Sequence, residues 1–296
     1  MLKSNPKISI IIVHYKVKKE LFNCLDSIEK SRPLVSYEVI VVDNDEEKTI
    51  DKEIRIKYPF VRYVPNPVNN GWGGGVNAGV KYANGEYIYL LNPDTIVKNG
   101  VVDILMKFMN KERDIGVASS TLLDRRGKRY PLQGTGFLTP LVALFAFSFI
   151  NKIIPRNPVS RKFWLLDADR KMPYRVDVAP LSASLVKKEL FKKIGGFDEN
   201  FFLYFEEYDF ANKIRKVGYE NYILPASKVI HIWGASAKKT GKTQEYIKES
   251  RKYYFSKYYG KLSALFIEFF LGLSRNNILL TTVITLVIAL VILLAV

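Results

Sequence analysis

The sequence predicts an α/β fold in which helices cover a mostly parallel central sheet. Short apolar segments of strand length alternate with segments whose apolar residues recur at helical spacing. Strands that alternate with helices form parallel sheets, because each helix carries the chain back to the end where the next strand begins. Hydrophobic residues make up 48% of the 296 positions, which is enough to bury a substantial core.

The first half of the chain carries the regular part of this pattern. Ile8–Val13 is apolar except for Ser9 and predicts a buried strand, and residues 18–31 place their apolar side chains on one face of a helix. The remaining predictions are strands at 38–43, 61–65 and 87–91, a glycine loop at 69–75, a helix at 76–84 and, in a less regular second part, a helix near 101–110 and strands near 115–122 and 175–187.

Polar side chains follow the predicted strands at the points where the strands end. His14 and Tyr15 follow the first strand, and Asp43 and Asn44 follow the second. The carboxyl ends of parallel strands share one edge of an open sheet, and such sheets bind ligands at that edge. Asp43 is therefore predicted either to accept a hydrogen bond from a base or ribose, or only to cap the loop that follows.

The run Leu91-Asn92-Pro93-Asp94 ends the strand predicted at 87–91. Because proline cannot continue a central strand, Asp94 should lie just past the carboxyl end of that strand. A carboxylate in this place can hold a divalent cation against the phosphates of a substrate. The alternative is a simple turn in which Asp94 caps the next helix.

The glycine loop matches a G-x-G-x-x-A string at residues 73–78. This string raises the alternative of a nicotinamide-dependent oxidoreductase, although here it does not follow the first strand as the dinucleotide-binding fingerprint requires. The glycines predict a loop whose backbone can approach a ligand closely, with Asn77 facing the same crevice.

An acidic cluster, Glu206, Glu207 and Asp209, lies inside an aromatic stretch of the second half. Carboxylates crowded among aromatic rings can have raised pKa values, which suits a general base. The alternative is a helix N-terminus whose acids satisfy the helix dipole. Further along, His231 stands between two isoleucines and is either a core residue or, with a carboxylate partner in space, a metal ligand.

The formal charge of +16 favours a basic surface that meets an anionic membrane or phosphorylated substrates. No nucleic-acid-binding motif accompanies the charge, so we expect no nucleic-acid partner. Residues 278–296 contain no charged side chain and are long enough to span a bilayer as a helix. Lysines and arginines precede this segment, which places the main domain on the cytoplasmic side of a cell inner or plasma membrane.

These observations predict three domains. Residues 1–255 form the main domain, 256–275 an amphipathic juxtamembrane segment and 276–296 a transmembrane helix. Within the main domain, residues 138–165 are a membrane-associating insertion. Their apolar part, 138–154, is too short to span and is expected to lie in the membrane interface, with a buried core helix as the alternative.

Taken together, the motifs resemble the family 2 inverting glycosyltransferases of the GT-A fold, and within them the rhamnosyltransferase-type enzymes. The resemblance covers roughly residues 8–236. It rests on the order and spacing of IIIVHY at 10–15, VVDN at 41–44, NGWGGGVNAG at 70–79, LNPD at 91–94, GGFD at 195–198 and FEEYD at 205–209.

The resemblance implies a role for each motif residue. Nucleotide-sugar binding would fall to His14, Tyr15, Asp43, Asn44, Asn70, Gly71, Asn77 and Asn92. Asp94 would bind a divalent metal, Mg²⁺ or Mn²⁺, under the diphosphate, and His231 would complete the metal site. Glu207 falls where the family usually has an aspartate as catalytic base, so Glu206 or Asp209 stay possible in that role. Asn92 stands where an aspartate is commoner and leaves the site one charge short.

The reaction implied by the resemblance is a single displacement with inversion. A carboxylate removes a proton from an acceptor hydroxyl as that hydroxyl attacks the anomeric carbon of a dTDP- or UDP-sugar, with dTDP-rhamnose as the expected donor. The acceptor would be a polyprenyl-diphosphate-linked saccharide at the membrane, in cell-surface polysaccharide synthesis. A second alternative is a catalytically silent, membrane-anchored nucleotide-binding protein, which the departures at Asn92 and Glu207 would suit.

Overall fold

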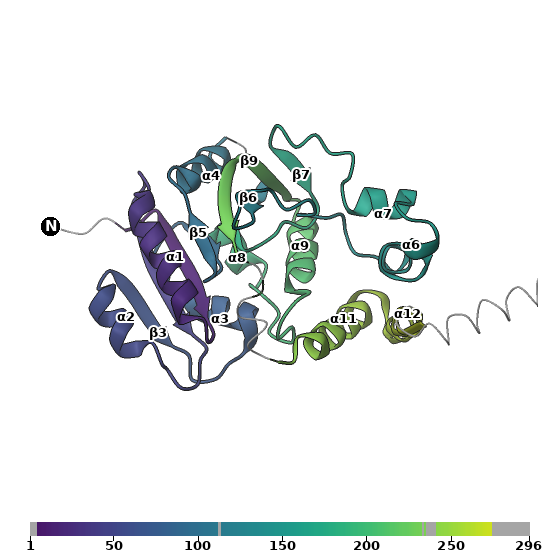
Figure 1. Ribbon diagram of the computed structural model, residues 1–296, viewed down its shortest axis with the longest axis horizontal. Coiled ribbons are helices and arrows are strands. Elements are labelled where there is room, and N and C mark those ends of the chain that lie inside the picture. Colours follow the sequence, from purple (N-terminus) through teal and green to yellow (C-terminus); the bar gives the residue numbers. More distant parts are fainter. Residues whose placement is uncertain (1–4, 112–113, 233, 235–240, 274–296) are drawn as a thin grey trace, which may run out of the picture. The chain divides into compact units, whose positions relative to one another are not determined.

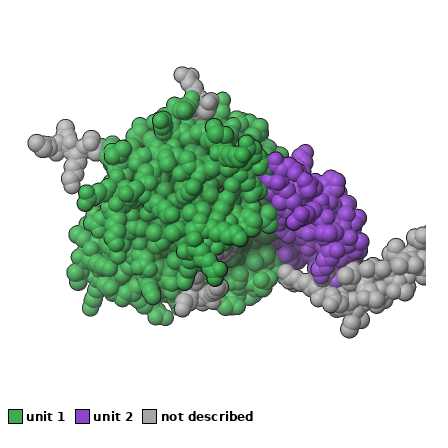
Figure 2. All heavy atoms as spheres, turned by 45° about the horizontal axis from the view of Figure 1, so that its top comes forward, with its two compact units in different colours: residues 1–137, 168–250 green, residues 138–167, 251–296 purple. Residues whose placement is uncertain are grey.

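The computed structural model describes residues 5–111, 114–232, 234 and 241–273. The chain divides into two compact units, drawn in separate colours in Figure 2: unit 1 holds residues 1–137 and 168–250, and unit 2 holds 138–167 and 251–296. The transmembrane helix predicted at 276–296 lies outside the described residues. Among the helices that are described, none is both long and apolar enough to cross a bilayer.

The first half of unit 1 alternates strands and helices as expected (Figure 1). Every residue of the first strand is buried, which explains why all but Ser9 and His14 are apolar. The elements are β1 (Ile8–His14), α1 (Lys18–Ser31), β2 (Tyr37–Asp43), α2 (Asp51–Lys57), β3 (Val61–Pro65), α3 (Gly71–Val80) and β4 (Tyr87–Leu91).

The second half of unit 1 is less regular. Its elements are β5 (Thr95–Val97), α4 (Val101–Met109), β6 (Ile115–Leu123), β7 (Tyr174–Val176), β8 (Ala183–Lys187), α8 (Lys188–Lys193), α9 (Glu206–Lys216) and β9 (Glu220–His231). The segment near 175–187, predicted as one strand, is two strands. Pro180 lies between them, in agreement with the rarity of proline inside central strands.

The described strands form one sheet in the order β3-β2-β1-β4-β8-β6-β9-β5, with β7 on β9. Pairing is parallel from β3 to β4, but β8 runs antiparallel to both β4 and β6, and β9 runs antiparallel to β5 and β7. The prediction of a mostly parallel sheet is therefore wrong for the second half, where the sheet is mixed. Each antiparallel pair there joins strands that are not consecutive in the chain, so no single strand–helix–strand crossover sets their relative direction.

The glycine-rich segment belongs to a helix instead of a loop. α3 begins at Gly71, five positions before the predicted start. A Cβ added at Gly75 would lie 2.7 Å from Val13 Cγ1, and one at Gly79 would lie 2.8 Å from Ile11 Cγ2. The glycines therefore let the α3 backbone lie directly on β1, which is a packing reason for a sequence that had suggested a ligand loop.

Unit 2 is helical in its described part. The segment at 138–154, expected as one helix, is broken into α5 (Pro140–Val142), the π-helical turn η1 (Ala143–Phe147) and α6 (Ile150–Ile153), followed by α7 (Pro158–Phe163). After α11 (Thr243–Tyr259), which is shared between the two units, unit 2 continues as α12 (Lys261–Leu273).

Candidate active site

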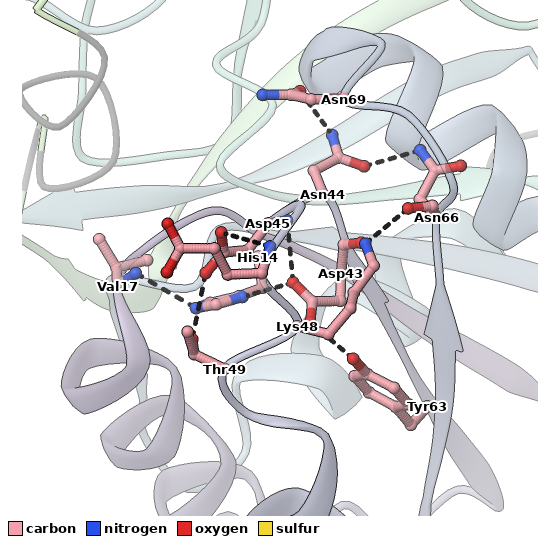
Figure 3. Close-up of polar contacts among 11 residues, drawn as sticks. His14, Val17, Asp43, Asn44, Asp45, Lys48, Thr49, Tyr63, Asn66 and Asn69 are labelled. Atoms are coloured by element: carbon pink, nitrogen blue, oxygen red, sulfur yellow. Dashed lines mark hydrogen bonds and ion pairs between the residues drawn. The ribbon is translucent and has the colours of Figure 1, made fainter.

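The carboxyl ends of β1 and β2 carry a closed hydrogen-bond network, drawn in Figure 3. The parallel register pairs His14 with Asp43, so the two side chains are neighbours. His14 Nδ1 lies 2.9 Å from Asp43 Oδ1, and the Tyr63 hydroxyl donates to Asp43 Oδ2 at 2.6 Å. The Asp45 N–H donates to Asp43 Oδ1 at 3.0 Å, which completes the set. Both oxygens of this fully buried carboxylate are thus engaged within the protein.

The network fixes the charge of Asp43 and the tautomer of His14. Burial acts to raise the pKa of the Asp43 carboxyl, but the hydrogen bonds from His14, Tyr63 and the Asp45 amide outweigh it, so the pKa lies below its ordinary value. The Val17 N–H donates to His14 Nε2 at 3.2 Å, so the ring proton is on Nδ1 and is donated to Asp43. Asp43 therefore braces the strand ends, and its contact with a nucleotide stays a prediction.

Amide side chains line the same edge next to this network. Asn66 Nδ2 donates to Asn44 Oδ1 at 2.8 Å and to Asn70 Oδ1 at 2.8 Å. Asn44 Nδ2 in turn donates to the Gly71 carbonyl at 2.9 Å, which ties the edge to the start of α3. Three predicted nucleotide-binding residues, Asn44, Asn70 and Gly71, are thus brought together, and the partly exposed Tyr15 follows β1 at the same end of the sheet.

Asn77 fastens α3 to the segment before α9. Its Nδ2 donates to the Phe197 carbonyl at 3.0 Å, and its Oδ1 accepts the Phe197 N–H at 3.0 Å. The same Nδ2 lies 3.0 Å from Glu199 Oε1. Both ends of this amide are engaged, so the structure gives Asn77 an anchoring position in addition to its predicted role in nucleotide binding.

Asp94 and His231 meet through the pairing of β5 with β9. Thr95 is opposite His231 in that pair, and the Ile232 N–H donates to the Asp94 carbonyl at 2.8 Å. His231 Nε2 consequently lies 3.2 Å from Asp94 Oδ1, and both side chains are nearly buried. A metal-ligand role for His231 requires a carboxylate partner in space; Asp94 meets that requirement, and metal binding itself stays a prediction.

Asn92 lies beside this pair. Its Nδ2 is 3.4 Å from His231 Nε2 and 3.2 Å from Ser182 Oγ. Its Oδ1 is buried and has no hydrogen-bond partner. A buried amide oxygen without a partner costs free energy, about 1–3 kcal/mol, and marks a place where a ligand atom would be stabilising.

These residues fit a divalent metal that takes most of its ligands from a substrate. No group of three or more His, Cys, Asp or Glu side chains within the described ranges could hold an ion alone. Asp94 and His231 offer two ligands, and the orphaned Asn92 oxygen is a third candidate. Mg²⁺ sites at phosphates commonly use one or two protein carboxylates with phosphate oxygens and waters, and a neutral imidazole is the commonest protein ligand of metal ions in general.

The acidic cluster opens α9 at a strained turn. Tyr204 and Phe205 have φ values of 67° and 69°, so two consecutive non-glycine residues adopt the left-handed conformation. Such residues cost of order 1–3 kcal/mol each and concentrate at functional sites. This turn places Glu206 and Glu207 at the first two positions of α9, where helix N–H groups point toward acids.

The two glutamates have raised pKa values. Burial raises the pKa of Glu206 well above its ordinary value, with a further contribution from the charge of Glu207. Burial also raises the pKa of Glu207. Glu206 Oε2 is buried without a hydrogen-bond partner, so the helix does not fully satisfy it. A carboxylate with a raised pKa is the better proton acceptor at neutral pH, which suits a general base.

Asp209, the third acid, differs from the two glutamates. Its side chain is buried, and its Oδ2 lies 3.2 Å from Lys213 Nζ, one turn further along α9. This ion pair holds the carboxylate inside the helix surface. Glu206 and Glu207 are therefore the better placed candidates for proton transfer.

The sequence missed Tyr63, Asn66 and Ser182. Asn66 directly follows β3, so the same strand-end reasoning used for Asp43 would have found it. Tyr63 lies inside β3 and not at its end, so the same reasoning does not reach it, and no sequence signal points to Ser182.

Known proteins that are similar to this chain include glycosyltransferases. Residues 9–195 match the family model described as "Glycosyl transferase family 2". The chain is 26% identical over 219 residues to an N-acetylglucosaminyl-diphospho-decaprenol L-rhamnosyltransferase of Mycobacterium tuberculosis, covering 69% of this chain and 68% of the relative. It is 29% identical over 207 residues to the Escherichia coli rhamnosyltransferase WbbL, covering 66% of this chain and 72% of that one.

Among solved structures, GalNAc-T7 with UDP, GalNAc and Mn²⁺ is similar with a TM-score of 0.57 at 17% identity. The match covers 86% of this chain but only 51% of that chain, so this chain spans about half of its length. At this identity the likeness shows the GT-A-like fold alone. Because the family model matches residues 9–195, more than half of the sequence, the chain belongs to the family 2 glycosyltransferases and is rhamnosyltransferase-like.

Proposed function

We propose that this protein transfers a sugar, L-rhamnose from dTDP-rhamnose, to a polyprenyl-diphosphate-linked saccharide with inversion at the anomeric carbon. The observation that carries the proposal is the meeting of Asp94 with His231 beyond β4, at 3.2 Å, next to the orphaned oxygen of Asn92. The relatives named for rhamnosyl transfer support the choice of sugar, and the relative named for a diphospho-decaprenol substrate supports the choice of acceptor.

The nucleotide would lie along the edge formed by the strand ends. Tyr15 and the Asn44–Asn70 amide group offer a partly exposed ring and hydrogen-bonding side chains for the base and ribose. The His14–Asp43–Tyr63 network would hold the loops behind the nucleotide in place. Because its groups already satisfy one another, the edge would not need to reorganise when a ligand binds.

Asp94 and His231, with the Asn92 oxygen, would hold a divalent metal against the diphosphate. Bound there, such an ion would supply positive charge to the oxygens of the leaving nucleoside diphosphate. The fold itself holds the Asp94 and His231 side chains in place. The backbone bond from Ile232 to Asp94 and the β5–β9 pairing keep the two ligands together.

Proton removal from the acceptor hydroxyl would fall to Glu207, with Glu206 as the alternative. The raised pKa of each carboxyl makes it a stronger base than an exposed glutamate. The proton would move to a glutamate oxygen as the hydroxyl oxygen forms the new bond and the bond to the diphosphate breaks. The left-handed turn at Tyr204 and Phe205 would hold the glutamates at the start of α9.

The oxidoreductase alternative loses its motivation in the structure. The glycine string lies inside α3, where Gly75 and Gly79 pack against β1. It does not form a phosphate-binding turn after the first strand, as a dinucleotide site requires.

A transfer assay tests the proposal. With dTDP-rhamnose, Mn²⁺ and a short polyprenyl-diphosphate saccharide, we expect product from the wild type and none from Asp94→Ala or Glu207→Gln. Glu53→Gln, an exposed ion-pair residue on α2, is the matched control and should keep full activity. Full transfer by Glu207→Gln would rule out Glu207 as the general base and assign that role to Glu206. Transfer from UDP-glucose but not dTDP-rhamnose would refute the donor.

A further inference from the structure

Unit 2 exposes an apolar stripe along α12. Leu262, Leu265, Phe266 and Phe269 are 83%, 57%, 50% and 58% exposed. Their spacing of three, four and seven residues places them on one face of the helix. Single exposed apolar side chains are ordinary, whereas a contiguous row of them indicates a surface that another phase or molecule covers.

The opposite face of α12 is buried within the protein. Ala264, Ile267 and Leu271 are buried, so α12 is apolar on two sides. The one carboxylate of the helix is also occupied. Glu268 receives two hydrogen bonds from Arg251, at 2.5 Å and 2.8 Å, and both side chains are largely buried. The exposed stripe therefore carries no negative charge toward its surroundings.

A second exposed apolar element lies at the end of α6. Ile153 and Ile154 are 63% and 54% exposed and stand between the exposed cations Lys152 and Arg156. The two elements are joined by stacked rings, because Phe149 lies parallel to Phe270 of α12 with centroids 6.3 Å apart and planes at 16°. Apolar side chains flanked by lysine or arginine are typical of segments that enter a lipid interface while the cations remain with the headgroups.

The charge of the described part of unit 2 favours an anionic partner. Its carboxylates are Asp167 and Glu268, and each forms an ion pair with an arginine of the same unit, Arg161 and Arg251. Six further cations accompany them: Lys152, Arg156, Lys162, Lys252, Lys257 and Lys261. A folded protein partner would need a matching acidic and apolar surface, whereas an anionic bilayer offers both properties at once.

The sequence that follows α12 favours the same occupant. Residues 278–296 contain no charged side chain, so the chain continues from the exposed stripe into a segment suited to hydrocarbon. We propose that α12 and the Ile153–Ile154 turn form a membrane-docking surface. On this surface the apolar side chains enter the interface of an anionic lipid bilayer, and the surrounding lysines and arginines bind its phosphate headgroups. The proposal goes beyond the sugar transfer and does not depend on it.

Environment-sensitive dyes on the full chain test this surface. Phe269→Cys carries the dye on the stripe, and Leu34→Cys, 91% exposed on unit 1, is the matched control. Cys24 is fully buried and burial raises the pKa of its thiol to about 12, so the dye reacts with the introduced cysteine. The probes are vesicles of phosphatidylcholine alone and of equal parts phosphatidylcholine and phosphatidylglycerol.

With the anionic vesicles, we expect the dye at position 269 to shift to the blue and to lose quenching by aqueous iodide, while the dye at position 34 changes in neither respect. Lys152→Glu combined with Arg156→Glu should reduce the shift at position 269. Circular dichroism and thermal unfolding would establish that each variant is folded.

Three results would overturn the proposal. In the first, the dye at position 269 stays as accessible to iodide as the dye at position 34 while the protein floats with the vesicles. In the second, the dye is shielded without lipid in a manner that depends on protein concentration, which would assign the stripe to a second copy. In the third, neutral and anionic vesicles give the same shift and the charge-reversal variant has no effect.

Discussion

Replacing Asp43 by asparagine separates a bracing role from a ligand-binding role. Asp43 accepts three hydrogen bonds inside the protein, from His14, Tyr63 and the Asp45 amide. Asparagine can still accept from His14 and Asp45 through its oxygen, but its NH₂ group would face the Tyr63 hydroxyl. The variant therefore loses the charged acceptor of a 2.6 Å bond and weakens the other two.

Hydrogen bonds to charged groups contribute about 1.5–3 kcal/mol, so we expect Asp43→Asn to lower the free energy of unfolding by about 2 kcal/mol. For a domain of this size that corresponds to a fall in Tm of about 4–8 °C. The loss should depend on pH. Because the pKa of Asp43 is depressed in the folded state, its stabilisation is complete above the ordinary value of 3.8 and is lost as pH falls through the folded-state value.

Thermal unfolding of the two proteins at neutral pH and at a pH below the ordinary value measures both effects. Asp51→Asn, which breaks an exposed ion pair with Arg55, is the control and should change Tm little. The bracing role would be refuted if Asp43→Asn kept the wild-type Tm and lost only its affinity for nucleoside diphosphates. A stability difference that did not shrink in acid would refute the charge argument.

Three other changes follow from the site. Glu206→Gln should raise the free energy of unfolding at neutral pH, because a carboxyl with a raised pKa destabilises the fold as pH rises above 4.5. Denaturant titration should show that this gain in stability disappears below pH 4.5, and an equal gain at neutral and acidic pH would contradict the argument. Gly71→Ala should destabilise far more than Gly100→Ala, since both glycines have similar positive φ but only a Cβ at Gly71 meets the Phe202 carbonyl, at 1.9 Å; equal Tm values would contradict this. Asn92→Asp should tighten Mn²⁺ binding in calorimetry by placing a second carboxylate at the site, and unchanged affinity would place the metal elsewhere.

The sequence predicted the half of the fold whose signals are local. Ile8–His14 and Tyr87–Leu91 are buried runs of strand length, and α1 matches its predicted bounds because its apolar face is regular. The mixed second half of the sheet could not be predicted, because strand direction there depends on which distant strands pair. Nothing near residue 183 records that β8 will lie between β4 and β6.

For the candidate site, too, the sequence predicted the features with local signals and not those that depend on distant contacts. Strand-end reasoning found Asp43 and Asp94, since a strand that stops at a polar residue is visible in the sequence. It could not show that Tyr63 donates a hydrogen bond to Asp43, or that the Asp94 carboxylate lies beside His231. Both contacts depend on which strands pair. The glycines of α3 were predicted to form a ligand-binding loop for a related reason. A close approach between backbones looks the same in sequence whether the neighbour is a ligand or strand β1.

The bonds between Asn77 and Phe197 also bear on how the enzyme is made. They join residues 120 positions apart, and they hold the segment that leads to Glu206 against α3. Closing so long a loop is slow and costs entropy that is recovered only when the contact forms. During synthesis, the ends of β1, β2 and β3 emerge first, whereas the turn before α9 gains the Asn77–Phe197 bonds only after Phe197 has left the ribosome. A nascent chain would then form the His14–Asp43–Tyr63 network well before the turn that carries Glu206 and Glu207.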